Sequence, residues 1–220
     1  MKVLELFAGT RSIGKAFEQR GHEVFSIDWN ELFDDIDWYV DVNDITAQDI
    51  IDKFGHPDVI WASPDCATYS MARIRDHRKK NEVTGELEPI SEYAKLCDRT
   101  NQYVIKLIKE LNPKYWFIEN PRAGMRTMLF MKDLPRYTTT YCQYNMDIPL
   151  EYRRQKPTDI WTNHPNPKFK PPCKRGASCH VSAPRGSNTG TQGIQCRHRE
   201  KFRAMIPKQL CEHIVDICEE

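Results

Sequence analysis

The sequence predicts an α/β fold with a doubly wound, mostly parallel sheet and a small irregular subdomain near its C-terminal end. Two observations carry this prediction. Short apolar runs alternate with helical patterns over residues 1–162, and residues 163–199, rich in Pro, Gly, Ser, Lys and Arg, show no clear period. Repeated strand–helix alternation is typical of a parallel sheet, because each crossover helix covers one of its faces. A chain of 220 residues is long enough to bury one core of this kind.

The individual elements follow from hydrophobic periodicity and from the residues that end each run. The expected strands are short apolar or alternating runs at 2–6, 23–27, 37–42, 58–62, 115–118, 137–143 and 158–161. The expected helices carry apolar residues three or four positions apart, at 11–20, 47–54, 91–111 and 209–218. Asn112-Pro113 ends the longest of them. We therefore expect an α/β domain at 1–162, a basic insert at 163–205, and a helix within 206–220 that packs on the domain.

Charge is unevenly distributed along the chain. The net charge is only +1, but residues 153–208 contain 13 Lys and Arg against two acidic residues, so this segment is +11 and the rest is −10. A basic segment suits a phosphate-binding surface, although a solvated loop could carry the same bias. A second basic run, residues 73–80, has no apolar period and is expected to be a mobile loop.

Several protein classes are excluded. The mean hydropathy is −0.67 and no apolar run approaches the roughly 18 residues of a membrane span. The N-terminal residues lack the apolar stretch and cleavage site of a signal peptide. We expect a cytoplasmic protein, in a bacterium or a phage-infected cell, with its eight cysteines outside disulfides.

Chemistry-bearing residues follow the predicted strands, where open α/β sheets bind ligands. Gly9 allows a tight turn after the first strand, and Asp28 follows the second, where a carboxylate can hold ribose hydroxyls. Trp29 beside it could stack on a base. Cys66 follows a buried strand and is placed to act as a nucleophile, or is simply a small buried side chain. Glu119 follows a later strand as a possible proton donor or as a helix-capping acid.

Together these motifs resemble the DNA cytosine-5 methyltransferases, most nearly the compact phage-encoded type, over about residues 3–161. The motifs, in order, are Phe7-Ala8-Gly9, Pro64 with Cys66, Glu119-Asn120 and the basic Arg motif at 153–158. The resemblance implies a Rossmann-like fold of the class I S-adenosylmethionine-dependent methyltransferases. It implies S-adenosylmethionine as cofactor and cytosine-containing DNA as partner.

The resemblance also implies roles for individual residues. The cofactor-binding residues would be Phe7, Ala8, Gly9, Thr10, Gly14, Asp28, Trp29, Asp41, Val42 and Pro64. The pair Asp44-Ile45 competes with Asp41-Val42 for the adenine edge. The DNA-binding residues would be Arg73, Arg75, Arg78, Lys79, Arg153, Lys156 and Arg185.

The implied chemistry uses three residues on a cytosine flipped out of the duplex. Cys66 would attack C6, so that C5 becomes enamine-like and takes the methyl group. Glu119 would protonate or hydrogen-bond N3, and Arg154 would contact the base near O2. Elimination would then restore the thiol.

The chain departs from the family pattern in ways that leave alternatives open. Asp65 stands between Pro64 and Cys66, and an added carboxylate would raise the pKa of the thiol unless a cation such as Arg154 offsets it. The Gly-Asn that helps close the family's cofactor site has no match, and no large target-recognition domain is present. The alternatives are an amino-methyltransferase acting on N4 of cytosine or N6 of adenine, an inactive relative that binds DNA or cofactor, and an enzyme with a modified donor or base.

The basic insert also carries potential metal ligands. Cys173, Cys179, His180 and Cys196 could hold a tetrahedral zinc, with His198 or His164 as substitutes. An insert with little apolar content would gain order from such an ion. The alternative is a loop with unligated thiols.

Overall fold

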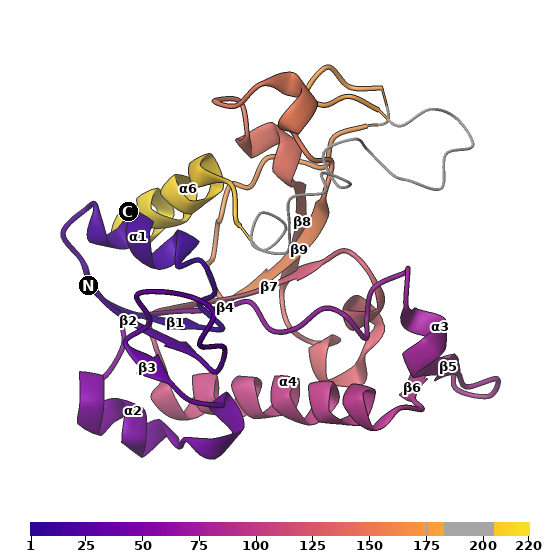
Figure 1. Cartoon of the computed structure of the whole chain (residues 1–220), viewed down its shortest axis with the longest axis horizontal. Helices are drawn as coiled ribbons and strands as arrows, with labels where there is room; N and C mark the ends of the chain where they lie inside the picture. Colours follow the sequence, from indigo (N-terminus) through magenta and orange to yellow (C-terminus); the bar gives the residue numbers. More distant parts are fainter. Residues whose placement is uncertain (175, 183–204) are drawn as a thin grey trace.

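The computed structural model describes residues 1–174, 176–182 and 205–220. Its core is a seven-stranded sheet in the order β3-β2-β1-β4-β7-β9-β8 (Figure 1). The strands are β1 (Lys2–Leu6), β2 (Glu23–Asp28), β3 (Trp38–Tyr39), β4 (Val59–Ala62), β7 (Tyr115–Pro121), β8 (Arg136–Thr140) and β9 (Pro157–Thr162). Strands β3, β2, β1, β4 and β7 are parallel, whereas β9 runs antiparallel to both β7 and β8. The predicted Rossmann-like, mostly parallel sheet is confirmed.

Helices cover both faces of the sheet (Figure 1). Helices α1 (Ser12–Glu18) and α6 (Lys208–Glu219) lie on one face, and α2 (Ala47–Phe54) and α4 (Glu92–Leu111) lie on the other. Each face buries its own apolar cluster, one with Val104 and Leu107 of α4 and the other with Leu210 and Ile214 of α6. Burial of both faces explains why β4 is apolar along its length and why Val3, Leu4 and Leu6 of β1 are fully buried.

The helix ends follow local sequence signals. Thr46 and Asp49 form a capping box at the start of α2, and the Ser91 hydroxyl accepts from the Ala94 N–H at the start of α4. Asn112 ends α4 in the left-handed conformation, with a φ of 44°. Because these signals lie within a few residues of each helix end, the sequence predicted both helices to within one residue.

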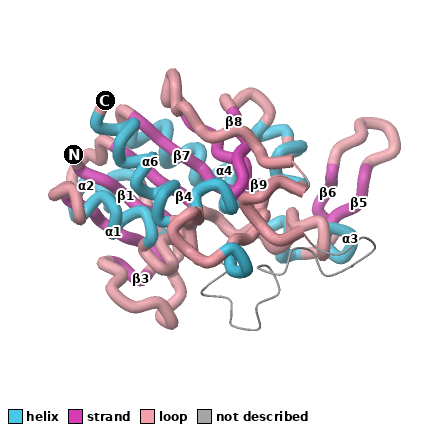
Figure 2. Tube along the Cα trace, turned by 90° about the horizontal axis from the view of Figure 1, so that it is seen from above, coloured by secondary structure: helices cyan, strands magenta, loops and turns pink. Residues whose placement is uncertain are grey.

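The segment between β4 and α4 is more ordered than expected. It contains the short helix α3 (Ile74–His77) and an antiparallel hairpin of β5 (Arg78–Lys80) and β6 (Leu87–Pro89). The hairpin projects from the body of the molecule (Figure 2). The Asn81 side chain accepts from two backbone N–H groups in the turn, a feature overlooked in the prediction of an unstructured loop at 73–80.

Three strands differ clearly from prediction: β3 covers only Trp38–Tyr39 of the expected 37–42, β7 is longer because it pairs with β9, and β8 ends earlier. Strand β7 continues through Glu119 and Asn120, which pair with Ile160 and Asp159 of β9, so these side chains lie in a strand and not beyond its end. Strand β8 ends at Thr140. The remaining short helices are 3-10 turns, η1 (Val42–Asp44), η2 (Gly124–Thr127), η3 (Leu129–Met131), η4 (Tyr141–Tyr144) and η5 (Leu150–Tyr152).

The C-terminal helix contacts the N-terminal part of the chain. Helix α6 packs on α1, and Asp216 and Glu219 of α6 form ion pairs with Arg20. Between β9 and α6, residues 163–174 and 176–182 contain no helix or strand, which is consistent with the irregular insert that was predicted. Within the described residues, no helix is both long and apolar enough to cross a membrane.

Candidate active site

A buried carboxylate of β1 stabilises the turn between β1 and α1. The two oxygens of Glu5 accept from the backbone N–H groups of Ile13 (3.2 Å) and Gly14 (3.0 Å) at the start of α1. A Cβ on Gly14 would lie 2.6 Å from Glu5, so only glycine fits there. Burial raises the pKa of Glu5 to about 8, against the opposing effect of the N–H donors. Sequence reasoning missed Glu5, although an acidic residue inside an apolar strand was its signal.

Asp28 fixes the same turn from the neighbouring strand. Its carboxylate accepts from the N–H of Gly9 (2.9 Å) and of Asn30 (2.8 Å), and the residue is buried. Gly9 adopts a positive φ of 50°, which glycine tolerates without strain. Trp29, the residue after Asp28, is 65 % exposed, so its ring is available to a ligand.

A cavity of about 350 Å³ opens beside this turn. Of the predicted cofactor residues, Phe7, Trp29, Asp41 and Pro64 line it. Its other lining residues are Asn43, Asp65, Tyr93, Leu96, Cys97, Thr100 and Asn101. Helix α4 supplies most of this second group, and sequence reasoning missed it because α4 was analysed only for its apolar face.

Other predicted cofactor residues lie elsewhere. Val42 is buried in the apolar core, as is its competitor Ile45, and Asp44 is exposed and does not line the cavity. Thr10 lines a different cavity of about 330 Å³ between α1 and α6. Of the two candidate pairs for the adenine edge, Asp41 alone faces the main cavity.

Cys66 lies just beyond the end of β4, in a turn that Asp65 organises. One Asp65 oxygen accepts from the Ala67 N–H at 2.7 Å, and the other accepts from the Tyr93 hydroxyl on α4. Asp65 is thus held at the exposed cavity side of the turn, while the neighbouring Cys66 is partly buried. Both oxygens of the inserted Asp65 carboxylate are therefore hydrogen-bonded, one to Ala67 and the other to Tyr93.

Glu119 lies on the adjacent strand β7 and is 5 % exposed. Its Oε1 accepts from the Tyr141 hydroxyl at 2.8 Å and lies 3.4 Å from Lys156 Nζ. The Asn120 amide donates to the Pro64 carbonyl at 3.0 Å, which ties β7 to the turn carrying Cys66. The carboxylate of one strand and the thiol of the next are therefore held in one network.

Charges in this network act on the Cys66 thiol. Burial raises its pKa, and Glu119 and Asp65 raise it further, whereas Lys156 lowers it. We had expected Arg154 to supply the offsetting cation. The structure gives this role to Lys156, which was predicted to bind DNA. Arg154 is buried and donates to the Met205 carbonyl at 3.3 Å.

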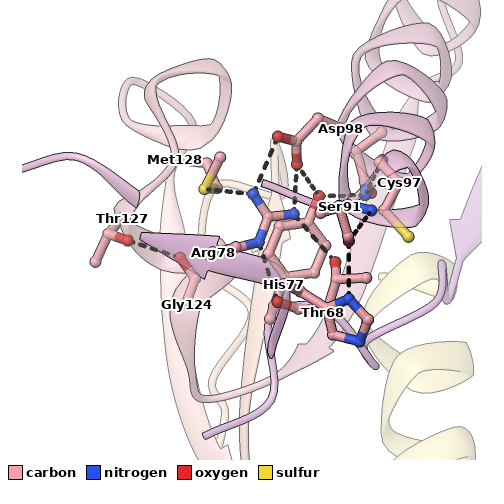
Figure 3. Close-up of polar contacts among 12 residues, drawn as sticks. Thr68, His77, Arg78, Ser91, Cys97, Asp98, Gly124, Thr127 and Met128 are labelled. Atoms are coloured by element: carbon pink, nitrogen blue, oxygen red, sulfur yellow. Dashed lines mark hydrogen bonds and ion pairs between the residues drawn. The ribbon is translucent and has the colours of Figure 1, made fainter. Parts of the chain in front are cut away.

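Arg78 requires a correction. Its side chain is 0 % exposed and pairs with both oxygens of Asp98 at 2.7 and 3.0 Å (Figure 3). It also donates to the carbonyl and hydroxyl of Thr68 and lies over the Tyr69 ring, 4.1 Å from its centroid. The guanidinium is enclosed by these partners, so it does not face a phosphate. The prediction that Arg78 binds DNA is wrong in this conformation.

The other predicted DNA contacts are distributed differently. Arg73, Arg75 and Lys79 are exposed around α3 and β5. Arg153 is partly buried and donates to the carbonyls of Met146 and Ile148. Arg185 lies outside the described residues.

Three cysteine sulfurs and one histidine nitrogen lie close together near the end of β8. Cys142, Cys173, Cys179 and His180 place these atoms within 4.8 Å of one another. Three of them were predicted as zinc ligands, but Cys142 was not, because its segment was taken as a strand. The predicted Cys196 and its substitute His198 lie outside the described residues. The other substitute, His164, is not part of the group and contacts the Ile217 carbonyl at 2.9 Å.

Comparison with known proteins gives consistent matches. The model of the C-5 cytosine-specific DNA methylases matches residues 1–129. A protein of frog virus 3 (isolate Goorha), named a probable DNA (cytosine-5)-methyltransferase, is 29 % identical over 238 residues, covering 99 % of this chain and 100 % of that protein.

Solved structures share the fold at low identity. An Escherichia coli prophage protein described as a DNA modification methyltransferase matches 74 % of this chain with a TM-score of 0.52 and 13 % identity. The Entamoeba histolytica methyltransferase EhMeth matches 80 % with a TM-score of 0.50 and 15 % identity. The matched part spans 46 % and 57 % of those two chains, so this chain corresponds to about half of each.

Proposed function

Because the chain belongs to the C-5 cytosine-specific DNA methylase family, we propose that it transfers a methyl group to C5 of cytosine in DNA. Cys66 is the nucleophile and S-adenosylmethionine is the methyl donor. The observation that carries the proposal is the network that links Cys66, Glu119 and Lys156 across the ends of β4 and β7. Glu119 and Lys156 are in contact, and the charges of both act on the Cys66 thiol, so a nucleophile, a proton donor and a cation, the groups that the reaction needs, occur together.

The main cavity fits the proposed methyl donor. Its volume of about 350 Å³ is within the range of small-molecule sites. The exposed Trp29 ring can stack on adenine, and Asp41 and Asn43 offer polar groups at its edge. Asp28 is buried and does not line this cavity; its carboxylate holds the Gly9 turn beside it. When bound there, S-adenosylmethionine supplies the methyl group.

Cys66 acts on a cytosine that has left the duplex stack, since a paired base could not reach it. The thiolate forms the Sγ–C6 bond, and the electrons of the C5–C6 double bond move into the ring. C5 then takes the methyl group. Water takes the C5 proton as the C6–Sγ bond breaks, which restores the C5–C6 double bond and the free thiolate and leaves the enzyme unchanged.

Glu119 and its partners stabilise the charge that builds in the ring. Glu119 protonates or hydrogen-bonds N3 as negative charge develops there. The Tyr141 hydroxyl orients the carboxyl group from the side, and Lys156 supplies positive charge to both Glu119 and Cys66. Arg154, two residues before Lys156, contacts the base near O2.

DNA reaches the site beside the exposed basic residues. Arg73, Arg75 and Lys79 lie on the segment that follows Cys66, where they can neutralise phosphates flanking the flipped base. Such contacts position the duplex without reading its sequence.

The test is nucleoside mass spectrometry of cytosine-containing DNA incubated with the full chain and S-adenosylmethionine. We expect 5-methylcytosine from the unaltered chain and none from Cys66→Ala. The matched control is Cys218→Ala, which removes a buried thiol of α6 remote from the site and should retain activity.

Three outcomes would contradict the proposal. Formation of N4-methylcytosine or N6-methyladenine would indicate an amino-methyltransferase. Unchanged activity in Cys66→Ala would exclude the nucleophile. Salt-dependent DNA binding without transfer to any DNA would indicate an inactive relative. DNA containing 5-fluorocytosine should also trap a covalent adduct at Cys66, since the fluorine cannot leave as a proton does.

A further inference from the structure

We propose that Cys142, Cys173, Cys179 and His180 bind one zinc ion, and that this ion fastens the insert to the strand ends that carry the partners of Glu119. The four residues come from two separate segments. Cys142 lies in η4 directly after β8, and the other three lie in the insert after β9. The proposal is independent of the methyl-transfer reaction, because it concerns a structural ion and none of its four ligands is a residue assigned to that reaction.

The geometry suits a tetrahedral ion. Cys142 Sγ lies 3.3 Å from Cys173 Sγ and 3.5 Å from Cys179 Sγ. His180 Nδ1 lies 3.4 Å from Cys179 Sγ and 3.8 Å from Cys173 Sγ. With Zn–S of about 2.3 Å and Zn–N of about 2.0 Å, neighbouring ligand atoms of a tetrahedron are about 3.5–3.8 Å apart. The observed separations of 3.3–3.8 Å lie within about 0.5 Å of these values and far exceed the roughly 2.05 Å of a disulfide bond.

The donor set indicates zinc in a structural role. Three thiolates and an imidazole form a closed four-ligand set, which leaves no position for substrate, and soft thiolates favour zinc over magnesium or calcium. Cys142 and His180 are buried, so the ion would be shielded from water.

Groups around the cluster already orient the ligands. The Ser182 hydroxyl lies 3.4 Å from His180 Nε2, the ring nitrogen that faces away from the thiols, and can accept its hydrogen. The Gln155 amide donates to Cys173 Sγ at 3.4 Å. Such contacts commonly fix metal-ligating side chains and tune their basicity.

The cluster lies next to the catalytic network through the backbone. Cys142 follows Tyr141, and Gln155 precedes Lys156, so each partner of Glu119 is adjacent to a residue of the cluster or one that contacts it. The Tyr141 N–H donates to the Lys156 carbonyl at 3.1 Å. An ion that fixes Cys142 and Cys173 therefore restrains both partners of Glu119.

The insert needs such a restraint. Residues 163–174 and 176–182 form no helix or strand, so few backbone hydrogen bonds hold them. Binding energy from a zinc site can supply order that a small apolar core cannot. Cys173 and Cys179 would make the insert part of the folded domain.

The first test measures metal in the full chain purified without a metal-binding tag. Elemental mass spectrometry should give about one zinc per chain, and exchange with Co²⁺ should give the visible absorption of tetrahedral cobalt bound to thiolates. A chain that folds and holds no zinc, even after incubation with Zn²⁺, would overturn the proposal. So would a disulfide among the three cysteines detected in the intact mass under non-reducing conditions.

Variants then identify the ligands. Cys142→Ser should lose at least about nine-tenths of the bound zinc, whereas Cys196→Ser and the buried-thiol control Cys218→Ser should retain it. Retention in Cys142→Ser with loss in Cys196→Ser would replace our ligand set by the one predicted from sequence, and would refute the proposal. Because Cys142→Ser alters a buried side chain as well as a ligand, His180→Cys provides a second variant that should retain one zinc in a four-thiolate set.

The restraint has its own readout, separate from methyl transfer. Removal of zinc by a chelator should increase hydrogen exchange in residues 140–143 and 153–156, while β1 exchanges as before. Unchanged exchange in both segments after complete removal would show that the ion does not hold the partners of Glu119.

Discussion

Two buried cation–carboxylate pairs, Arg78–Asp98 and Lys156–Glu119, show how similar contacts serve different purposes. Each cation comes from a basic run that the sequence assigned to DNA. Arg78 is 0 % exposed beside an Asp98 that is 10 % exposed, whereas Lys156 is 21 % exposed beside a Glu119 that is 7 % exposed. The two carboxylates are similarly buried, but the Arg78 cation is closed to solvent and the Lys156 cation is partly open to it.

The number of partners separates the two pairs. Arg78 donates to Asp98, to both oxygens of Thr68 and to Met128 Sδ, so its fork of N–H groups is occupied (Figure 3). Lys156 has one carboxylate at 3.4 Å and the face of the Tyr141 ring, so its ammonium group keeps donors for a substrate. We infer that Arg78–Asp98 stabilises the fold and that Lys156–Glu119 serves the reaction.

The largest expected effect comes from Glu119→Gln. The amide cannot give up a proton to the ring, so methyl transfer should fall by about 10²–10⁴-fold, the usual contribution of a general acid. The free energy of unfolding should change little, because Gln still accepts from Tyr141. The matched variant Asp98→Asn should show the reverse, with lower stability and retained turnover per folded chain. Equal losses of activity in both variants would abolish the distinction between the pairs.

Removing the enclosed Arg78 cation should destabilise the protein. Arg78→Met leaves Asp98 buried without its cation, so the free energy of unfolding should fall by about 3–5 kcal/mol in urea titrations. The neighbouring Lys79→Met, on the exposed side of β5, should stay within about 0.5 kcal/mol of the unaltered chain. A second change, Asp98→Leu, should recover part of the loss, since no unpaired charge is then buried.

Removing the partly exposed Lys156 cation should alter the pH dependence of the reaction. Lys156 lowers the pKa of Cys66, so Lys156→Met raises that pKa further and reduces the thiolate fraction at neutral pH. We expect about a tenfold lower rate near pH 7 for each unit that the pKa rises, with recovery as the pH increases. Lys156→Arg should keep the unaltered profile. A uniform loss at every pH would show that Lys156 does not act through the thiol.

The smallest expected effect concerns the exposed side of the first basic run. Lys79→Ala should weaken DNA binding several-fold and reduce the slope of log affinity against log salt by about 1, as loss of one phosphate contact does. Lys109→Ala, on the exposed face of α4, is the charge-matched control and should leave the slope unchanged. An identical slope in both variants would exclude the β5 hairpin from the DNA interface.

Elements with local signals were predicted well. The observed bounds of β1 and α2 coincide with the expected 2–6 and 47–54, because an apolar run and a capping box lie within the segments themselves. The extension of β7 to Pro121 was missed, because it depends on pairing with β9 nearly forty residues later. The motif residues Cys66 and Glu119 were identified from order alone, but Tyr141 was not, since its partner Glu119 lies 22 residues away. Glu5 was overlooked although its partners Ile13 and Gly14 are near in sequence.

The sequence by itself determined most strands of the main sheet, the helices on its two faces, the order of the motifs, and the division of the chain into an acidic body and a basic segment. Only the tertiary structure decided which cations turn inward. A carboxylate buried by packing, such as Asp98 or Glu119, requires a charged or hydrogen-bonding partner, because an unpaired buried charge is costly. Arg78 lies 20 residues from Asp98 and Lys156 lies 37 residues from Glu119, so each pairing arises from the fold and not from local sequence.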